Sequence, residues 1–528
     1  MATSNNQVII VGAGHNGLIV AFYLAKAGLR PLVLERRHII GGSAVTEELH
    51  PGFRCPTVQH SLGPMIPKVV ADLQLEKNGL GMITPDVRVF APRLEGPPVC
   101  LYQDASRTAR ALETISSHDA KAYPKFLSSF AAIGKVLEPV MSMTPPSINE
   151  PAKESLWELA KLGMKFRGLS KKDAFRLLRW VPMAVADLAA EWFETETLRA
   201  IIAARGVYCS LAGPWSAGTS SGLLMQAALN GNAIAPSLFV KGGIGSLTQS
   251  IATSATAAGA QIRTGVHVKS IQVDGGKVSG VVLSNGEEIA ATTVISNADP
   301  RSTYLNLLDP VELDPDFRMR IHNYRCMGSS AKVNLALSDL PEFIGTKSDR
   351  AIMAGRIHIG PEIDYLEQAY DAAKYGAPSP HPFLDITIPS LTDPSLAPQG
   401  GHVMSIHVQY TPFKLKSGDW NLHRKALGET VIKTLSEYAP NVNGLIIAQQ
   451  VLTPLDLEEQ FGLSGGHILH GEPSLDQLFA FRPLHGWAQY RSPIKGLYLC
   501  GSGTHPGGGV TGAPGFNAGR EILKDLKA

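Results

Sequence analysis

Three glycines and one glutamate near the amino terminus have the types and spacing that bind a dinucleotide. Gly12, Gly14 and Gly17 form the pattern GxGxxG, and Glu35 follows 18 residues after the last of them. The first glycine permits a tight turn, the second lets the backbone approach a pyrophosphate, and the third lets a helix lie close to a sheet. The Glu35 carboxylate can accept hydrogen bonds from the ribose hydroxyls of an adenosine. These residues predict a dinucleotide site for an unphosphorylated ribose.

Such a site needs a strand, a helix and a second strand to hold it. Residues 8–11 are an apolar run of the buried-strand type, residues 18–25 carry apolar side chains at helical spacing, and residues 32–35 read as the second strand. The helix then offers free N–H groups and a positive dipole end to the phosphates. The alternative is a glycine-rich turn with no ligand, but the complete unit favours the dinucleotide site.

Two other segments resemble those that hold FAD in flavin-dependent oxidases. Arg36-Arg37 followed by Gly41-Gly42 resembles a second segment that contacts the phosphates. Near the carboxyl end, a strand over 496–500 enters a glycine turn, and residues 505–513 lead to a helix that we expect from about Gly515. An ordinary strand, turn and helix is the alternative there. Apart from residues 8–35, no strand–helix–strand unit in the sequence opens on GxGxxG, and no CxxC pair occurs, so we expect neither tightly bound NAD(P)H nor a redox disulfide.

The chain as a whole resembles the phytoene desaturase-like flavoproteins, which include carotenoid desaturases and isomerases and retinol saturase. The runs that carry the resemblance are residues 12–17, 35–38, 41–48, 409–412, 461–463, 474–478 and 496–509. It implies an α/β (α+β overall) fold, with a Rossmann-like FAD-binding domain and a discontinuous substrate domain of sheet and helices. It also implies FAD as cofactor, although Ser502 stands where many FAD enzymes have an aspartate.

The residues expected to contact FAD come from both ends of the chain and from one strand between them. They are Gly12, Gly14, His15, Asn16, Gly17, Glu35, Arg36, Arg37, Gly41, Gly42, Ser43, Val268, Gly501, Ser502, Gly509 and Val510. Val268 is included because its strand, read over 261–273, supplies backbone contacts to adenine in enzymes of this type.

The expected FAD-binding domain is discontinuous, with residues 1–75, 236–300 and 485–528, and the substrate domain takes 76–235 and 301–484. A helix that follows residues 241–246 and ends at about 258, hairpins at 274–276 and 284–286, and the closing run 293–299 belong to the first. Strands over 332–337, 384–388 and 403–408 belong to the second, where we expect them to form a sheet over the flavin face.

A basic stretch from Lys161 to Trp180 interleaves seven Lys and Arg with apolar side chains. It has two interpretations: a solvated helix face, which we favour, or helices near 155–195 that lie on an anionic membrane surface. Docking on lipid would suit an apolar polyene substrate.

The leading hypothesis for function is an FAD-dependent oxidoreductase that desaturates, saturates or isomerises a hydrophobic, polyene or lipid-like substrate, with oxygen or a quinone as electron acceptor. The alternatives are a flavin amine oxidase and a non-catalytic, flavin-bearing regulatory protein. No catalytic residue is identified. His505, Lys332, Tyr410 and His407 are candidates, and for Lys332 we favour an exposed structural lysine. We expect no metal, because no ligand-like spacing of His, Cys and carboxylates occurs.

Composition limits the partners and the location. The chain has 528 residues, 44% of them apolar, and a net charge of +2, which excludes bulk disorder and gives no reason to expect nucleic acid. No apolar run is long enough to span a bilayer, and residues 1–7 show neither a signal nor a transit peptide. We expect a cytoplasmic protein, peripheral on the membrane if the basic helices dock, or a mitochondrial one in a eukaryote. The sequence is compatible with a homodimer.

Overall fold

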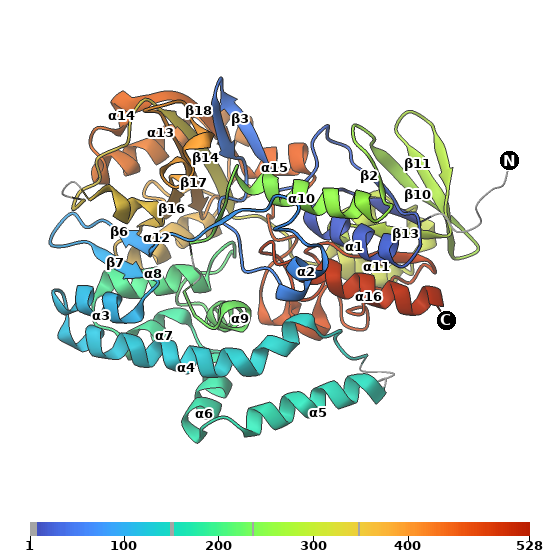
Figure 1. Ribbon diagram of the computed structural model, residues 1–528, viewed down its shortest axis with the longest axis horizontal. Coiled ribbons are helices and arrows are strands. Elements are labelled where there is room, and N and C mark those ends of the chain that lie inside the picture. Colours follow the sequence, from blue (N-terminus) through green and yellow to red (C-terminus); the bar gives the residue numbers. More distant parts are fainter. Residues whose placement is uncertain (1–7, 148–152, 235–236, 347–348, 528) are drawn as a thin grey trace.

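The computed structural model describes residues 8–147, 153–234, 237–346 and 349–527. Residues 1–7, where we expect no targeting signal, lie outside this described part. Figure 1 shows a parallel-sheet region that holds the first described residues and the carboxyl end, a second sheet region beside it, and a layer of helices below.

The first sheet is parallel and joins segments that are far apart in the sequence. Its order is β19-β13-β1-β2-β9. The bounds are β1 Val8–Val11, β2 Leu32–Leu34, β9 Gln261–Arg263, β13 Thr293–Ser296 and β19 Leu497–Leu499. Ile10 aligns with Val33 on one side and with Ile295 on the other. The predicted α/β class is confirmed, together with the strand–helix–strand unit at the amino terminus.

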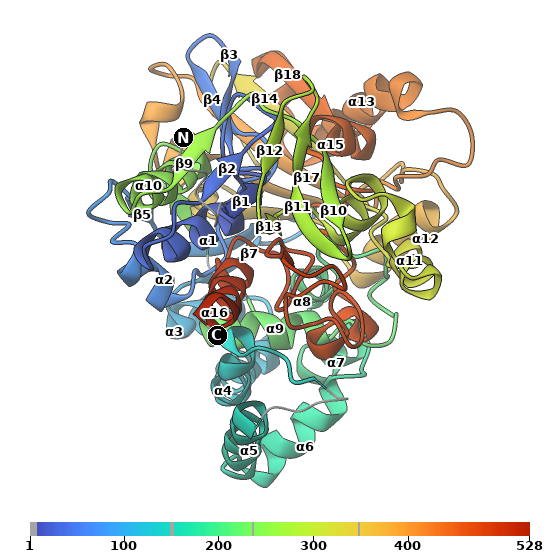
Figure 2. The ribbon, with the colours of Figure 1, turned by 90° about the vertical axis from the view of Figure 1, so that its right-hand side faces the viewer.

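Both faces of this sheet are covered, because successive side chains of a strand point to opposite faces. Val8 and Ile10 belong to the apolar core with helices α1 (His15–Lys26), α10 (Ile244–Ala257) and α16 (Ala513–Lys527). Ile9 and Val11 belong to the core with a three-stranded sheet and helix α11 (Pro315–His322). Figure 2 shows this smaller sheet, formed by β10 (Val268–Asp274), β11 (Lys277–Leu283) and β12 (Glu288–Ala290).

The predicted strand over 261–273 is wrong as a single element. The structure breaks it into β9 and β10, which belong to different sheets. Gly265 has a φ of +69°, and its N–H donates to the carbonyl of Arg37 at 2.9 Å, so the chain turns against the end of β2. Both predicted hairpins are confirmed. The carboxyl-terminal helix begins at Ala513, two residues earlier than expected.

The second large sheet has seven strands in the order β18-β14-β17-β16-β15-β6-β7. The bounds are β6 Val87–Ala91, β7 Val99–Tyr102, β14 Ser330–Leu337, β15 Arg356–Ile359, β16 Leu384–Thr387, β17 His402–Gln409 and β18 Ile446–Leu452. The three predicted strands are therefore confirmed as β14, β16 and β17. On one face, Val333, Leu335 and Ile406 share an apolar core with α13 (Trp420–Tyr438). The opposite face carries buried polar side chains.

The helices below the second sheet share an apolar core of their own, to which Phe126, Phe130 and Trp180 contribute. Their bounds are α3 Ala105–Glu113, α4 Ser117–Ser142, α5 Lys153–Arg167, α6 Lys171–Trp180, α7 Val185–Trp192, α8 Glu196–Gly206, α9 Ser221–Asn230 and α12 Ile363–Lys374. Figure 1 shows α5 and α6 projecting away from the body. Within the described ranges, no helix has both the length and the apolar character needed to cross a membrane.

Short elements complete the chain. They are β3 Thr46–His50, β4 Phe53–Pro56, α2 Pro67–Asp72, β5 Met82–Ile83, β8 Phe239–Val240, α14 Val442–Leu445 and α15 Pro454–Phe461. β3 pairs with β4 and β5 with β8, each antiparallel.

Candidate functional site

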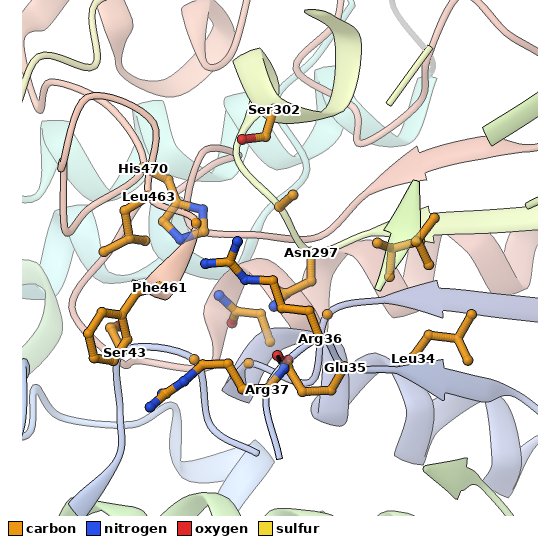
Figure 3. A pocket seen from close by; sticks show the side chains of 18 of the residues that line it. Leu34, Glu35, Arg36, Arg37, Ser43, Asn297, Ser302, Phe461, Leu463 and His470 are labelled. Carbon is orange, nitrogen blue, oxygen red and sulfur yellow. Dashed lines mark hydrogen bonds between the residues drawn. The ribbon is translucent and has the colours of Figure 1, made fainter. Parts of the chain in front are cut away.

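A cavity of about 340 Å³ lies where the turn between β1 and α1 meets the end of β2. Most of the residues predicted to contact FAD line it: Gly12, Gly14, His15, Asn16, Glu35, Arg36, Arg37, Gly41, Gly42, Ser43, Val268 and Ser502. Figure 3 shows Glu35, Asn297, Phe461 and His470 arranged around this first cavity. The tertiary structure thus brings together residues that are up to 490 positions apart in the chain.

The amino terminus of α1 has no side-chain cap. Gly14 is the residue at its cap position, and the first turn carries no acidic side chain. The first-turn N–H groups therefore keep their capacity to bind an anion. A Cβ on Gly14 would lie 2.5 Å from the side-chain nitrogen of Asn297, and one on Gly17 would lie 2.4 Å from the carbonyl oxygen of Gly12. A Cβ at Gly17 would therefore collide with the backbone, whereas one at Gly14 would only displace the end of the Asn297 side chain.

Two backbone amides fix the orientation of the Glu35 carboxylate. The N–H of Ala13 donates to one of its oxygens at 2.8 Å, and the N–H of Arg37 donates to the other at 2.9 Å. Each carboxylate oxygen can accept a further hydrogen bond. Glu35 is buried yet lines the first cavity, and its carboxylate is held in one orientation there.

The two arginines after Glu35 supply positive charge to the same cavity. Arg37 donates to Glu47 at 2.7 Å, and its guanidinium lies 4.5 Å from the centre of the Phe461 ring. Its Nη1 is buried and has no hydrogen-bond partner among the described residues. The uncapped helix end and Arg37 line the same cavity, and together they fit the pyrophosphate of the predicted dinucleotide.

Four of the predicted FAD-contact residues do not line the first cavity. Gly17 packs against Gly12, and a Cβ on Gly501 would lie 2.6 Å from the carbonyl oxygen of Asn297. Val510 is buried with a φ of 57°, an unusual conformation for a β-branched residue. Gly509 lines a second cavity instead.

Sequence reasoning missed part of the wall of the first cavity. Asn297 also lines it, and so does the segment 458–470, which we expected in the substrate domain. Within that segment His470 lies near His15, whose pKa falls to about 4 because of burial and the nearby His470. The run 461–463 was noticed only through the family resemblance, and no local periodicity would have placed it here.

The second cavity, of about 140 Å³, lies beside the glycine turn at 507–509. Its apolar wall is formed by Leu62, Met141, Met225, Leu229, Leu469 and Leu478. Its polar wall includes Arg205, Tyr208, Gln226 and Arg356. A Cβ on Gly63, another lining residue, would lie 2.4 Å from the carbonyl oxygen of Gly509, so the turn and residues 59–64 fit closely.

Lys332 is buried, so the expectation of an exposed lysine is wrong. Its side chain lies on the polar face of the seven-stranded sheet, and the residue is only 1% exposed. Nζ donates to Ser405 at 2.7 Å and lies 3.0 Å from Nδ1 of His60. Burial lowers the pKa of Lys332 to about 7, although nearby Cys55 and Asp385 act in the opposite direction.

Asp385 is a buried carboxylate on the same face. Its Oδ2 lies 3.1 Å from Nη1 of Arg205 and 3.9 Å from Nε2 of His60. Burial by itself would raise the pKa of this carboxyl, but His60 and the charges of Arg356 and Arg205 outweigh it and hold the pKa well below its usual range. Asp385 is therefore ionised at neutral pH.

The other catalytic candidates are engaged in protein contacts. Nε2 of His505 lies 2.7 Å from the carbonyl oxygen of Val140, and the Tyr410 hydroxyl donates to the carbonyl of Ala212 at 2.9 Å. His407 lies 3.0 Å from the side chain of Gln409. Neither these three nor Lys332 lines either cavity, so no catalytic role is assigned. Among the described residues, no three His, Cys, Asp or Glu side chains group as metal ligands.

Comparisons with known proteins agree with this geometry. Residues 17–342 match the family described as flavin containing amine oxidoreductase. A rat protein, pyridine nucleotide-disulfide oxidoreductase domain-containing protein 2, is 37% identical and covers 99% of this chain and 94% of its own. A phytoene desaturase from Fusarium fujikuroi is 26% identical, over 99% and 90% of the two chains. A solved structure of a putrescine oxidase variant matches with a TM-score of 0.61 at 14% identity, over 99% of each chain, which supports the fold.

Proposed function

Because this chain belongs to the flavin containing amine oxidoreductase family, we propose that it is an FAD-dependent enzyme that exchanges hydride with an apolar, polyene or lipid-like substrate. FAD is its cofactor, and a small-molecule substrate and an electron acceptor complete the reaction. When bound, FAD accepts or returns a hydride at N5, the step that the side chains of a protein do not perform themselves. The acceptor that we propose is oxygen or a quinone.

The chain's own residues bind and orient these groups. We propose that the amino terminus of α1, with Arg36 and Arg37, holds the pyrophosphate and that Glu35 binds the ribose hydroxyls. Val268 borders the cavity where the adenine is expected. We further propose that residues 1–75, 236–300 and 485–528 form the FAD-binding domain and that 76–235 and 301–484 form the substrate domain.

One observation carries the choice of an apolar substrate. The second cavity lies beside the turn at 507–509, and leucine and methionine side chains form much of its wall. The turn follows Ser502, which lines the first cavity, so a flavin that extends from the first cavity would reach the second. Apolar walls exclude water from the reacting carbon and bring it near the flavin. Desaturation, saturation and isomerisation all suit this arrangement.

Anaerobic reduction of the bound flavin tests the proposal. The purified holoprotein should be yellow, and a polyene, retinoid or acyl-lipid substrate should bleach its flavin absorbance without oxygen. For a saturation, chemically reduced flavin should instead be reoxidised by the unsaturated compound. Bleaching by amines such as putrescine, with no response to any apolar compound, would favour the amine oxidase alternative. Bound flavin that responds to none of these compounds would favour a non-catalytic role.

We also propose that α5 and α6 rest on an anionic membrane surface. The basic stretch forms two helices, separated at Gly168–Ser170, and the Ser170 side chain caps α6. The large apolar side chains exposed on them are Leu156, Trp157, Met164, Phe175 and Leu178. Lys161, Lys165, Arg167, Lys171 and Lys172 are also exposed. The predicted stretch 155–195 reaches too far, however, because α7 buries much of its apolar surface in the protein core.

Flotation with lipid vesicles tests this contact. Wild-type protein should float with vesicles of phosphatidylcholine and phosphatidylglycerol, and less with phosphatidylcholine alone, because each basic residue near an anionic surface adds about 1 kcal/mol. The double substitution Lys171→Glu and Lys172→Glu should abolish flotation. Lys425→Glu on α13, also exposed, is the matched control. Equal flotation of the double variant and the control would contradict the proposal.

A further inference from the structure

The polar wall of the second cavity carries more positive than negative charge. Arg205, Arg356 and Arg482 line the cavity, and Arg356 is only 2% exposed. Arg482 donates to backbone carbonyls, including that of Ser502. Arg88 is close enough to Arg356 to help lower its pKa, although burial is the larger cause. Asp385 is the carboxylate that interacts with Arg205 and Arg356.

The neighbouring titratable side chains do not balance this charge. Burial lowers the pKa of His60 and His358 to about 4 and that of His407 to about 3, so all three are neutral at pH 7. Burial also raises the pKa of the Tyr208 hydroxyl well above its usual value, which keeps it protonated. Lys332, with a pKa of about 7, adds partial positive charge. The polar wall of the second cavity and the titratable side chains around it therefore have a net positive charge at neutral pH.

Two polar atoms at this wall have no hydrogen-bond partner in the part of the chain that the structure describes. Nε of Arg205 and Oε1 of Gln226 are both buried, and neither has a hydrogen-bond partner among the described residues. Both residues line the second cavity. Arg205 also stacks on Tyr208, with its guanidinium carbon 4.3 Å from the ring centre, which fixes its position. Unsatisfied polar atoms in a protein interior are uncommon and indicate a ligand or ordered water.

Buried excess charge of this kind is costly unless an anion offsets it. A planar carboxylate suits this wall, because it can accept two hydrogen bonds from a guanidinium. Leucine and methionine side chains form much of the remaining wall, together with glycines and prolines, which suits a hydrocarbon chain. A cationic amine would meet repulsion from the same arginines.

We propose that the second cavity binds an apolar molecule that ends in a carboxylate, with the carboxylate held by Arg205 and Arg356. This inference rests on the proposed function, which it narrows from apolar substrates in general to amphipathic acids. It places the acid group at the sheet and the chain along the apolar wall beside residues 507–509.

Titration of the holoprotein with matched ligands tests this assignment. Dodecanoate, dodecanol, dodecylamine and dodecyl phosphate have the same chain and differ in the head group, and octanoate and hexadecanoate extend the range of chain lengths. The readout is the change in absorbance of the bound flavin, which requires binding but no turnover. We expect an acid of this series to bind at least about 10-fold more tightly than the matching alcohol and amine, because it gains hydrogen bonds between charged groups.

Arg205→Gln should weaken binding of the acid by about 10- to 100-fold and leave binding of the alcohol unchanged. Arg263→Gln, which removes an exposed arginine paired with Glu287, is the matched control. Flavin content shows whether each variant is folded. If Arg205→Gln fails to retain flavin, the wild-type comparison of acid, alcohol and amine decides the inference by itself.

The outcomes separate this inference from the proposed function. Equal binding of acid and alcohol, tighter binding of the amine or the phosphate, or no binding of any acid would overturn the carboxylate assignment. Each of these results leaves a flavoprotein with an apolar substrate intact. A holoprotein that cannot be loaded with FAD would instead overturn the proposed function.

Discussion

The buried Lys332 leads to a quantitative prediction about stability and pH. Its ordinary pKa of 10.5 falls to about 7 in the folded protein because burial disfavours the charged ammonium. Between these two pH values the unfolded chain holds a proton that the folded protein has released. The free energy of unfolding therefore rises with pH in this window. Below pH 7 and above pH 10.5, Lys332 no longer makes it depend on pH.

The magnitude follows from the size of the change in pKa. One pH unit corresponds to about 1.4 kcal/mol, so Lys332 should contribute about 4 kcal/mol to the increase in unfolding free energy between pH 7 and pH 10. Lys332→Met lacks the titrating group and should lack this increase. The stability of the variant relative to wild type should be highest at pH 7 and fall by about 4 kcal/mol by pH 10.

Urea unfolding of the FAD-loaded protein at pH 7, 8, 9 and 10 measures this difference. Lys77→Met, at an exposed lysine, is the matched control, and its difference from wild type should stay nearly constant over the same range. A constant difference between Lys332→Met and wild type would refute the reasoning, because it would mean that Lys332 keeps an ordinary pKa in the folded protein.

Three other substitutions, the first of them with a matched control, give distinct results. Gly17→Ala should weaken FAD binding at least about 100-fold in a flavin titration, because the new Cβ would lie 2.4 Å from the backbone oxygen of Gly12. Gly163→Ala is the control, since no atom lies within 4 Å of its Cβ. This variant should keep wild-type affinity and add up to about 1 kcal/mol to helix stability. Asp385→Asn should lower the unfolding free energy by about 3–5 kcal/mol at pH 7, since buried guanidinium groups lose their carboxylate, and an unchanged urea midpoint would contradict this. Arg482→Met should cost at least about 3 kcal/mol and release flavin, because this buried guanidinium donates to backbone carbonyls including that of Ser502; retention of both stability and flavin would argue against that role.

The sequence was sufficient to predict an element where the pattern that indicates it spans only a few residues. Residues 8–35 contain the strand, the glycine turn, the helix and the acidic residue of one unit, and the structure shows each of them at its predicted place. Steric limits at glycine and the periodicity of apolar residues act over a few positions, so they can be read without knowing the rest of the fold. The expected strand over 261–273 failed because the alternation of its side chains continues through the turn at Gly265.

Only the tertiary structure shows that the polar face of the seven-stranded sheet is buried. Lys332, Ser405 and His407 alternate with apolar residues, and this pattern is the same whether the polar face meets water or the protein interior. The structure covers that face with His60 and Tyr208, which come from distant parts of the chain. The segment 458–470 reaches the first cavity in the same way.

The amino-acid sequence by itself therefore determined the dinucleotide unit, the class of fold and the flavin family, because each depends on short-range geometry or on motifs that remain recognisable in isolation. The tertiary structure alone decided the burial of Lys332 and Asp385 and the grouping of Arg205 and Arg356 at one cavity. The physical reason is that the cost of burying a charge depends on what surrounds it, and here those surroundings come from strands and helices far apart in the chain.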